Sequence, residues 1–182
     1  MKHIIHIFGA SGSGTSTLGR KISTELGFRF MDTDDYFWMP TNPPYTTKRP
    51  PDERLAMIRA DIEESENVVL SGALSKWGDP LIPYFTLAIR LHTDTALRIE
   101  RLKRREHAKF GSRIDEGGDM HRAHLDFLAW AASYDTGDLN MRSCAEHNAW
   151  QKLLSCPLLE LDGGADLQEN FLRVREALSQ QI

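Results

Sequence analysis

The sequence predicts an α/β fold, in which a central parallel sheet of about five strands is covered by helices on both faces. Short apolar, β-branched segments alternate with longer segments whose apolar residues recur at helical spacing, as in βαβ units. Glycine, serine, aspartate or histidine follows these apolar segments, and such sheets bind ligands beyond the carboxyl ends of their strands. The length of 182 residues, with 41% apolar residues, is enough for a single domain with a sizeable core.

Five segments are β-branched or aromatic and end at a turn signal, and they therefore predict strands. They cover residues 4–8, 28–31, 67–70, 85–91 and 157–161. Between and after them, the spacing of apolar residues predicts five helices. These cover residues 15–26, a segment from Pro51, a segment from Thr93 or Asp94 to about Phe110, a segment capped by Asp119, and a last one around residues 167–178.

Two segments predict loops of functional interest. Residues 36–51 are rich in proline and aromatic residues, which excludes regular structure, and a loop of this length in a compact domain is usually functional. Residues 111–119 end in Gly117-Gly118 and predict a small lid. The helix before this lid is expected to bury Ala96, Ile99 and Leu102.

Composition and charge exclude several classes of protein. The net charge of −4 argues against a protein whose whole surface binds a nucleic-acid polymer. Two cysteines are too few for a disulfide framework, and no stretch approaches the roughly 20 apolar residues that span a bilayer. The N-terminal apolar run lacks the features of a signal peptide. We therefore expect a cytoplasmic protein without membrane contact, as a monomer or a homodimer.

The strongest motif is a glycine- and serine-rich loop between the first strand and the first helix. It comprises Gly9, Ala10, Ser11, Gly12, Ser13, Gly14, Thr15, Ser16 and Thr17. Glycines let successive backbone N–H groups converge on phosphate oxygens, and the helix N-terminus adds partial positive charge. In the pattern G-x-x-x-x-G-K-[ST], Ser16 stands at the magnesium-binding hydroxyl and Thr15 replaces the lysine. The alternative is a tight turn without a ligand.

Carboxylates and a basic run supply the other candidate groups. Asp32, Asp34 and Asp35 follow the second strand, where carboxylates can hold magnesium or accept a proton from an attacking hydroxyl. Alternatively they form a solvated turn or a helix cap. Arg105 and Arg113 belong to a basic run that approaches the lid, where arginines can stabilise a transferring phosphoryl group, although such a run is often only a solvated helix face.

These motifs resemble the small P-loop kinases of the adenylate kinase and shikimate kinase type. The resemblance rests on residues 9–17, Asp32 to Asp34, residues 69–72 and the arginine-bearing segment 101–113. It implies a P-loop NTPase fold, a three-layer α/β/α sandwich with a lid. It also implies that Asp32 assists magnesium at Ser16 and that Asp34 holds or deprotonates the acceptor. Residues 35–37 look like the acidic-aromatic turn of uridine-kinase-like enzymes.

The expected function is Mg²⁺-dependent transfer of the γ-phosphoryl group of ATP to a small-molecule acceptor. We expect the acceptor near Asp34, Asp35, Arg49 and Gly72, with Arg49, Arg54 or Arg59 as partners if it carries phosphate. A cation from elsewhere would replace the loop lysine. The candidates are Lys48, Lys76, Arg105 and Arg113. The alternatives are a nucleotide-binding protein without kinase activity and a loop that binds another anion.

Overall fold

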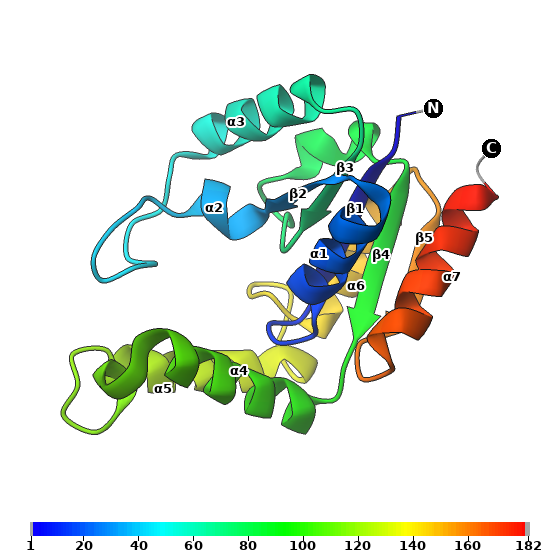
Figure 1. The fold of residues 1–182 in the computed structure, drawn as a ribbon. Helices are drawn as coiled ribbons and strands as arrows, with labels where there is room; N and C mark the ends of the chain where they lie inside the picture. Colours follow the sequence, from blue (N-terminus) through cyan, green and yellow to red (C-terminus); the bar gives the residue numbers. More distant parts are fainter. Residues whose placement is uncertain (1, 181–182) are drawn as a thin grey trace.

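A five-stranded parallel sheet forms the centre of the computed structural model, which describes residues 2–180 (Figure 1). The strand order is β2-β3-β1-β4-β5. The strands are β1 (Ile4–Gly9), β2 (Arg29–Asp32), β3 (Val68–Ser71), β4 (Leu87–His92) and β5 (Leu158–Asp162). The predicted fold class is therefore confirmed, with strand ends that differ from the predicted ranges by at most two residues.

Helices lie on both faces of this sheet. The α-helices are α1 (Thr15–Leu26), α2 (Thr33–Phe37), α3 (Pro51–Glu64), α4 (Thr95–Phe110), α5 (His121–Ala132), α6 (Cys144–Trp150) and α7 (Leu167–Ser179). Four short 3-10 helices are η1 (Asp79–Tyr84), η2 (Gly111–Ile114), η3 (Ser133–Asp135) and η4 (Gln151–Leu153). Helices α1 and α7 pack on one face and α3 with α6 on the other, while α4 and α5 form an arm that projects from the sheet (Figure 1).

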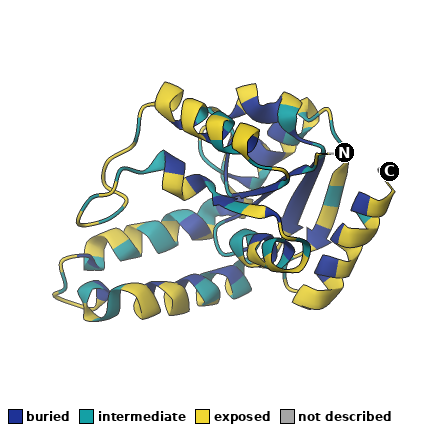
Figure 2. Ribbon diagram, turned by 45° about the horizontal axis from the view of Figure 1, so that its top comes forward, coloured by how far each residue is buried: buried dark blue, intermediate teal, exposed yellow. Residues whose placement is uncertain are grey.

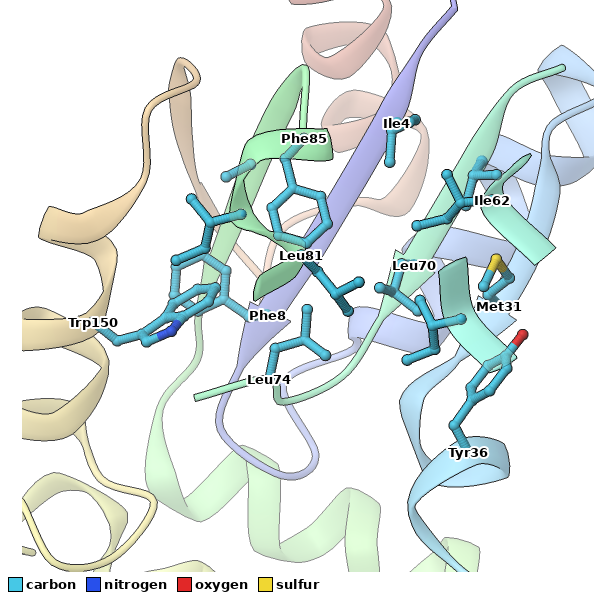
Figure 3. Close-up of a cluster of buried hydrophobic side chains, with 14 residues drawn as sticks. Ile4, Phe8, Met31, Tyr36, Ile62, Leu70, Leu74, Leu81, Phe85 and Trp150 are labelled. Carbon is cyan, nitrogen blue, oxygen red and sulfur yellow. The ribbon is translucent and has the colours of Figure 1, made fainter. Parts of the chain in front are cut away.

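The alternation of side chains along β1 divides the core into two parts. Ile4 and Phe8 point to the cluster that α3, η1 and α6 cover, where Phe8 meets Trp150 edge-on at 5.3 Å (Figure 3). Ile5 and Ile7 point to the cluster under α1 and α7. Figure 2 shows the buried strands between helices whose outer faces are exposed. Burying each such side chain contributes about 1.5–3 kcal/mol, so both faces hold the sheet in place.

The segment after β2 differs from the prediction. Tyr36 and Phe37 belong to the short helix α2 and not to an irregular loop. Its N-cap is Asp32, whose side chain accepts a hydrogen bond from the Asp34 N–H group. Tyr36 is buried and donates its hydroxyl hydrogen to Asp61 at 2.5 Å, which fixes α2 against α3 (Figure 3).

The structure of the arm differs from the sequence prediction in two respects, namely the buried residues of α4 and the extent of the lid. Ala96 is exposed and Ile99 only partly buried, whereas Arg98, Leu102 and Glu106 are the buried residues of α4. Arg98 can be buried because its guanidinium donates to two backbone carbonyls and pairs with Asp135 at 3.1 Å. The predicted lid, residues 111–119, is only the tip of the arm.

Asp119 does not cap α5, because the N-cap position is Met120. Asp119 accepts two hydrogen bonds from Arg113 instead, at 3.0 and 2.7 Å. Among residues 2–180, no helix combines the length and the apolar character that spanning a membrane requires.

Two buried histidines lie in the core beside the sheet. His6 stacks against Phe8 and Phe85, with ring centroids 5.5 and 4.9 Å apart, and its Nδ1 lies 3.1 Å from the Leu70 carbonyl oxygen. His147 contacts the Tyr134 hydroxyl through Nδ1 at 2.9 Å. Burial lowers the pKa of each imidazole from 6.5 to about 3, since the apolar surroundings favour the neutral form.

We predict that these histidines make the protein less stable as the pH falls. The unfolded chain binds a proton at each near pH 6.5, whereas the folded protein does so only near pH 3, so stability is lost between these values. At pH 5, each histidine should cost about 2 kcal/mol of unfolding free energy, at about 1.4 kcal/mol per pH unit. Urea unfolding of the parent and His6→Leu at pH 8 and pH 5 tests this.

At pH 8 the side chain at position 6 is neutral in both the parent and His6→Leu, so the difference between their free energies of unfolding measures packing alone. The expected result is a smaller loss of stability for His6→Leu than for the parent on going to pH 5. Equal losses would show that His6 does not resist protonation in the folded protein.

Candidate active site

The loop between β1 and α1 has the geometry of an anion-binding nest. Gly12 and Gly14 have φ values of 82° and 101°, and the Ser13 N–H group closes a turn on the Ala10 carbonyl at 3.1 Å. The first helical hydrogen bond runs from the Leu18 N–H group to the Gly14 carbonyl, at 3.0 Å. The N–H groups that precede it, at residues 15–17, have no acceptor within the helix and can serve an anion.

Helix α4 and the segment before it pack directly against this loop. A Cβ atom on Gly12 would lie 2.7 Å from the Arg98 carbonyl oxygen, so α4 packs where a side chain would otherwise be. The Thr93 hydroxyl donates to the Ser13 carbonyl at 3.2 Å. The loop is therefore held from the β4–α4 side before any ligand arrives.

The predicted magnesium residues lie together. The Ser16 hydroxyl donates to Asp32 Oδ2 at 2.9 Å, and it lies 3.4 Å from the Ser71 hydroxyl. Two oxygen donors beside an anion nest fit Mg²⁺, which keeps several of its waters and takes one or two protein ligands together with phosphate oxygens. In the described part of the chain, no group of three or more His, Cys, Asp or Glu side chains is arranged to hold a metal ion, and this pair needs none.

Gly72 has a positioning role in the structure. Its φ is 122°, and a Cβ atom there would lie 1.9 Å from Thr33 Oγ1. The close approach lets α2 begin directly above the end of β3. Gly72 was expected to contact substrate, and what the structure shows is that it places the helix that carries Asp34 and Asp35.

Asp34 lies on α2 in unusual electrostatic surroundings. Its side chain reaches water on one side, yet the enclosing protein desolvates the carboxylate and raises its pKa above 3.8, and the charge of Asp32 raises it further. Arg142 and Arg105 oppose this effect. Desolvation and Asp32 also raise the pKa of Asp35, with Arg20 and Lys109 opposing. Carboxylates with raised pKa values in a cleft are typical of proton-transfer sites.

Arg142 is a site residue that the sequence analysis missed. Protein surrounds its guanidinium, which lowers its pKa, while Asp34 and Glu146 stabilise its charge. The Cζ atom lies 5.3 Å from the centre of the Trp130 ring. A sequence signal was available, because residues 143–146 form the S-x-x-E pattern of a helix start, and Ser143 indeed caps α6 through the Glu146 N–H group at 3.0 Å.

The arginines of the basic run differ in how close they lie to the phosphate loop and to Asp34. Arg105 is exposed, pairs with Glu106 at 3.2 Å and acts electrostatically on Asp34. Arg113 pairs with Asp119 at the tip of the arm, so the structure does not bring it to the loop. Arg101, which belonged to the basic run but not to the predicted site, donates to the Gly163 carbonyl at 2.9 Å and lies beside Gly14.

Two cavities open at this edge of the sheet. One of about 400 Å³ lies between the loop, the end of β4 and η3, and its lining includes Ala10, His92 and Tyr134. The other, of about 310 Å³, lies beside Asp34, Asp35 and Arg49. Arg49 was predicted to contact substrate, and its Nε atom donates to the Tyr36 carbonyl at 3.0 Å.

Comparisons with solved structures identify the same fold in small-molecule kinases. A shikimate kinase from Bacteroides thetaiotaomicron matches with a TM-score of 0.59 at 16% identity, over 97% of this chain and 98% of that one. A gluconokinase from Sinorhizobium meliloti 1021 matches with a TM-score of 0.54 at 23% identity, over 98% and 97%. A shikimate kinase from Acinetobacter baumannii in complex with shikimate matches with a TM-score of 0.56 at 14% identity, over 99% and 94%.

Sequence comparisons identify the family. The Bacillus subtilis (strain 168) protein "Uncharacterized protein YqaC" is 40% identical over 179 residues, which cover 98% of this chain and 99% of that protein. Residues 5–121, which include the phosphate loop, Asp32, Asp34 and the arm helix α4, match the family described as "AAA domain". The chain therefore belongs to this AAA-domain family of P-loop NTPases, and within that family it has the fold of the small-molecule kinases.

Proposed function

We propose that the protein transfers the γ-phosphoryl group of ATP to a hydroxyl group of a small molecule, with Mg²⁺. The observation that carries this proposal is the 2.9 Å hydrogen bond between Ser16 and Asp32, with Asp34 in the first turn of the helix that Asp32 caps. It supports a site beside the anion nest in which Ser16 and Asp32 would hold Mg²⁺ and Asp34 would act as the base. The kinase neighbours support the reaction class.

Each group has a distinct role in this proposal. The free N–H groups of the loop and of the first helical turn, which include those of residues 15–17, bind the phosphates. Ser16 with Asp32 would hold the metal, which neutralises phosphate charge when bound. Asp34 accepts the proton of the acceptor hydroxyl. Its pKa, raised by desolvation and by the charge of Asp32, makes it a stronger base than an ordinary aspartate.

The loop lysine is replaced by cations from other elements. Arg105 of α4 and Arg142 before α6 both act on Asp34, where the transferred group would lie. Arg113 would contribute only after it leaves Asp119 and the arm closes. Of the other expected cations, Lys48 faces the Phe37 ring at 5.9 Å and Lys76 acts electrostatically on Glu146. Arg105 and Arg142 act on Asp34 itself and are therefore the better placed cations.

Nucleotide binding without transfer is the second candidate function. Thr15 at the lysine position favours it, because a charge-assisted hydrogen bond to phosphate, worth roughly 1.5–3 kcal/mol, is absent from the loop. The Asp34 site favours transfer, because binding alone requires no base beside the metal ligands.

We predict that MgATP stabilises the fold through the backbone nest, whose donors do not depend on a lysine. A thermal melt should show stabilisation of roughly 2.7 kcal/mol at 100 times the dissociation constant. Ser16→Ala should reduce the effect of Mg²⁺ on ATP binding, whereas Ser179→Ala, at the exposed end of α7, should not. No stabilisation by millimolar MgATP, ADP or GTP would contradict the phosphate-loop assignment.

We predict that Asp34→Asn abolishes phosphoryl transfer and leaves MgATP binding nearly intact. Asparagine keeps the shape but cannot accept the proton, and general bases contribute about 10²–10⁴-fold to rates. The assay follows label from γ-³²P ATP into a pool of low-mass metabolites, with Asp126→Asn on the exposed face of α5 as the matched control. Label transfer by Asp34→Asn at the parent rate would exclude Asp34 as the base.

We predict that Arg142→Gln raises the pKa of Asp34 further and that Asp32→Asn lowers it, because the first removes an opposing positive charge and the second a like charge. Carboxyl ¹³C NMR titration measures both shifts. Arg122→Gln, on the exposed side of α5, serves as the control and should leave the Asp34 titration unchanged. If the Asp34 pKa were the same in Arg142→Gln as in the parent, the Arg142 charge would not act on the Asp34 carboxylate.

A further inference from the structure

The cavity beside Asp34 has a lining that the transfer reaction itself does not explain. Its volume is about 310 Å³, at the small end of the roughly 300–1,000 Å³ typical of ligand pockets. Besides the two carboxylates, its walls include Trp38, Pro40, Tyr45 and Arg49. One side of the cavity thus holds the proposed base, and the other side is aromatic and apolar.

The aromatic side is built before any ligand binds. The loop after α2 doubles back on itself, with the Met39 N–H group donating to the Thr47 carbonyl at 2.9 Å and the Arg49 N–H group to the Phe37 carbonyl at 2.8 Å. The hydroxyls of Thr41 and Thr46 lie 2.8 Å apart across its end. These contacts fix the backbone of the loop that carries Trp38 and Tyr45, so a ligand does not have to order the loop.

The rings are arranged to receive a flat ligand. Trp38 and Tyr45 lie 5.9 Å apart between centroids at 70° to each other, and Phe37 meets Trp38 at 4.9 Å. Trp38 and Tyr45 therefore contact each other edge-on, and both rings present surface to the cavity. A planar ring in the cavity would stack on, or meet edge-on, the surface of one of them, which are the two favoured aromatic geometries.

The side chains that line the cavity disfavour an anion. Asp34 and Asp35 outnumber Arg49 in the lining, and the Arg49 Nε atom already donates to the Tyr36 carbonyl. Arg105 and Arg142, which act on Asp34, are not part of the lining. Arg54, one of the expected partners of a phosphorylated acceptor, is buried with its guanidinium 3.8 Å from the Phe37 ring centre. Lys109 of α4 donates to the Tyr45 hydroxyl and lies against that ring.

We propose that this cavity binds the non-reacting part of the acceptor, and that the acceptor is an uncharged molecule with a flat aromatic or heteroaromatic ring. The ring stacks on the aromatic surface that Trp38 and Tyr45 present to the cavity, and a hydroxyl of the same molecule reaches Asp34. Asp35, at the rim, accepts a hydrogen bond from a polar group of the ligand. The assignment of the hydroxyl rests on the proposed function, whereas the assignment of the ring rests on the cavity alone.

Calorimetric titration of the full chain tests the ring and the charge separately. The probes are uridine, cytidine, adenosine, guanosine and benzyl alcohol, with each nucleoside's monophosphate and ribose as matched comparisons. We expect at least one ring compound to bind, and a bound nucleoside to bind at least tenfold more tightly than its monophosphate and than ribose. Absence of binding by all five, or equal binding of a monophosphate or of ribose, would overturn the proposal.

Variants locate the binding. Trp38→Leu should weaken it at least tenfold, because stacking on the indole is lost, and Trp38→Phe should restore most of it. Tyr84→Leu, just before the amino end of β4 at the opposite edge of the sheet, should bind like the parent. If Trp38→Leu fails to show the parent's melting behaviour, Tyr45→Leu takes its place. If neither Trp38→Leu nor Tyr45→Leu weakened the binding, the proposal would be overturned.

The outcomes for the cavity and for the reaction are distinguishable. Ring binding that depends on Trp38, without transfer of label from ATP, would support the cavity assignment and contradict the proposed function. Label transfer to an anionic acceptor at the parent rate in Trp38→Leu would support the proposed function and overturn the cavity assignment.

Discussion

The Asp32 carboxylate is the point from which the rest of the site is built. Its Oδ2 atom accepts a hydrogen bond from Ser16 at 2.9 Å, and its Oδ1 atom accepts one from the Asp34 N–H group at 3.1 Å. One side chain thus ties the phosphate loop to the end of β2 and also starts the helix that carries the candidate base. The sheet order makes this possible, because β3 lies between β1 and β2 and brings Ser71 within 3.4 Å of Ser16.

Such a compact arrangement has an electrostatic cost. Desolvation raises the pKa of Asp34, and the charge of Asp32, two residues away at the N-cap of the same helix, raises it further. Arg105 and Arg142 limit the rise, and they come from parts of the chain that are far apart in sequence. The basicity of Asp34 is therefore set jointly by β2, the arm and the segment before α6.

Local signals explain how much of this could be predicted from the sequence. The residues of β1, the phosphate loop and α1 are consecutive, and glycines, apolar periodicity and Gly27 define them without help from distant residues. The strand ends meet at one edge of a parallel sheet, which placed Ser16 beside Asp32. Asp32 is an ordinary N-cap residue, as the helix-cap alternative for these aspartates expected, whereas the proline- and aromatic-rich segment from Tyr36 concealed the short helix α2.

Tertiary packing explains what could not be predicted. Arg98 and Arg54 are charged residues that are buried because carbonyls and aromatic rings elsewhere in the chain receive them. Arg142 faces Asp34 only because the arm returns to the sheet before α6. Likewise, the pairing of Arg113 with Asp119 within the arm tip competes with any contact to the loop, and the basic run alone could not show it.

In the proposed reaction, this distribution of cations has a mechanistic consequence. Without a lysine in the loop, the positive charges lie toward Asp34 and the acceptor and not along the bound nucleotide, so they interact most strongly with the phosphoryl group in transit. Interactions that strengthen in the transition state raise the rate without tightening the ground state. A loop that binds ATP through backbone donors alone is compatible with such a site, provided that the arginines are held where the acceptor hydroxyl meets the γ-phosphate.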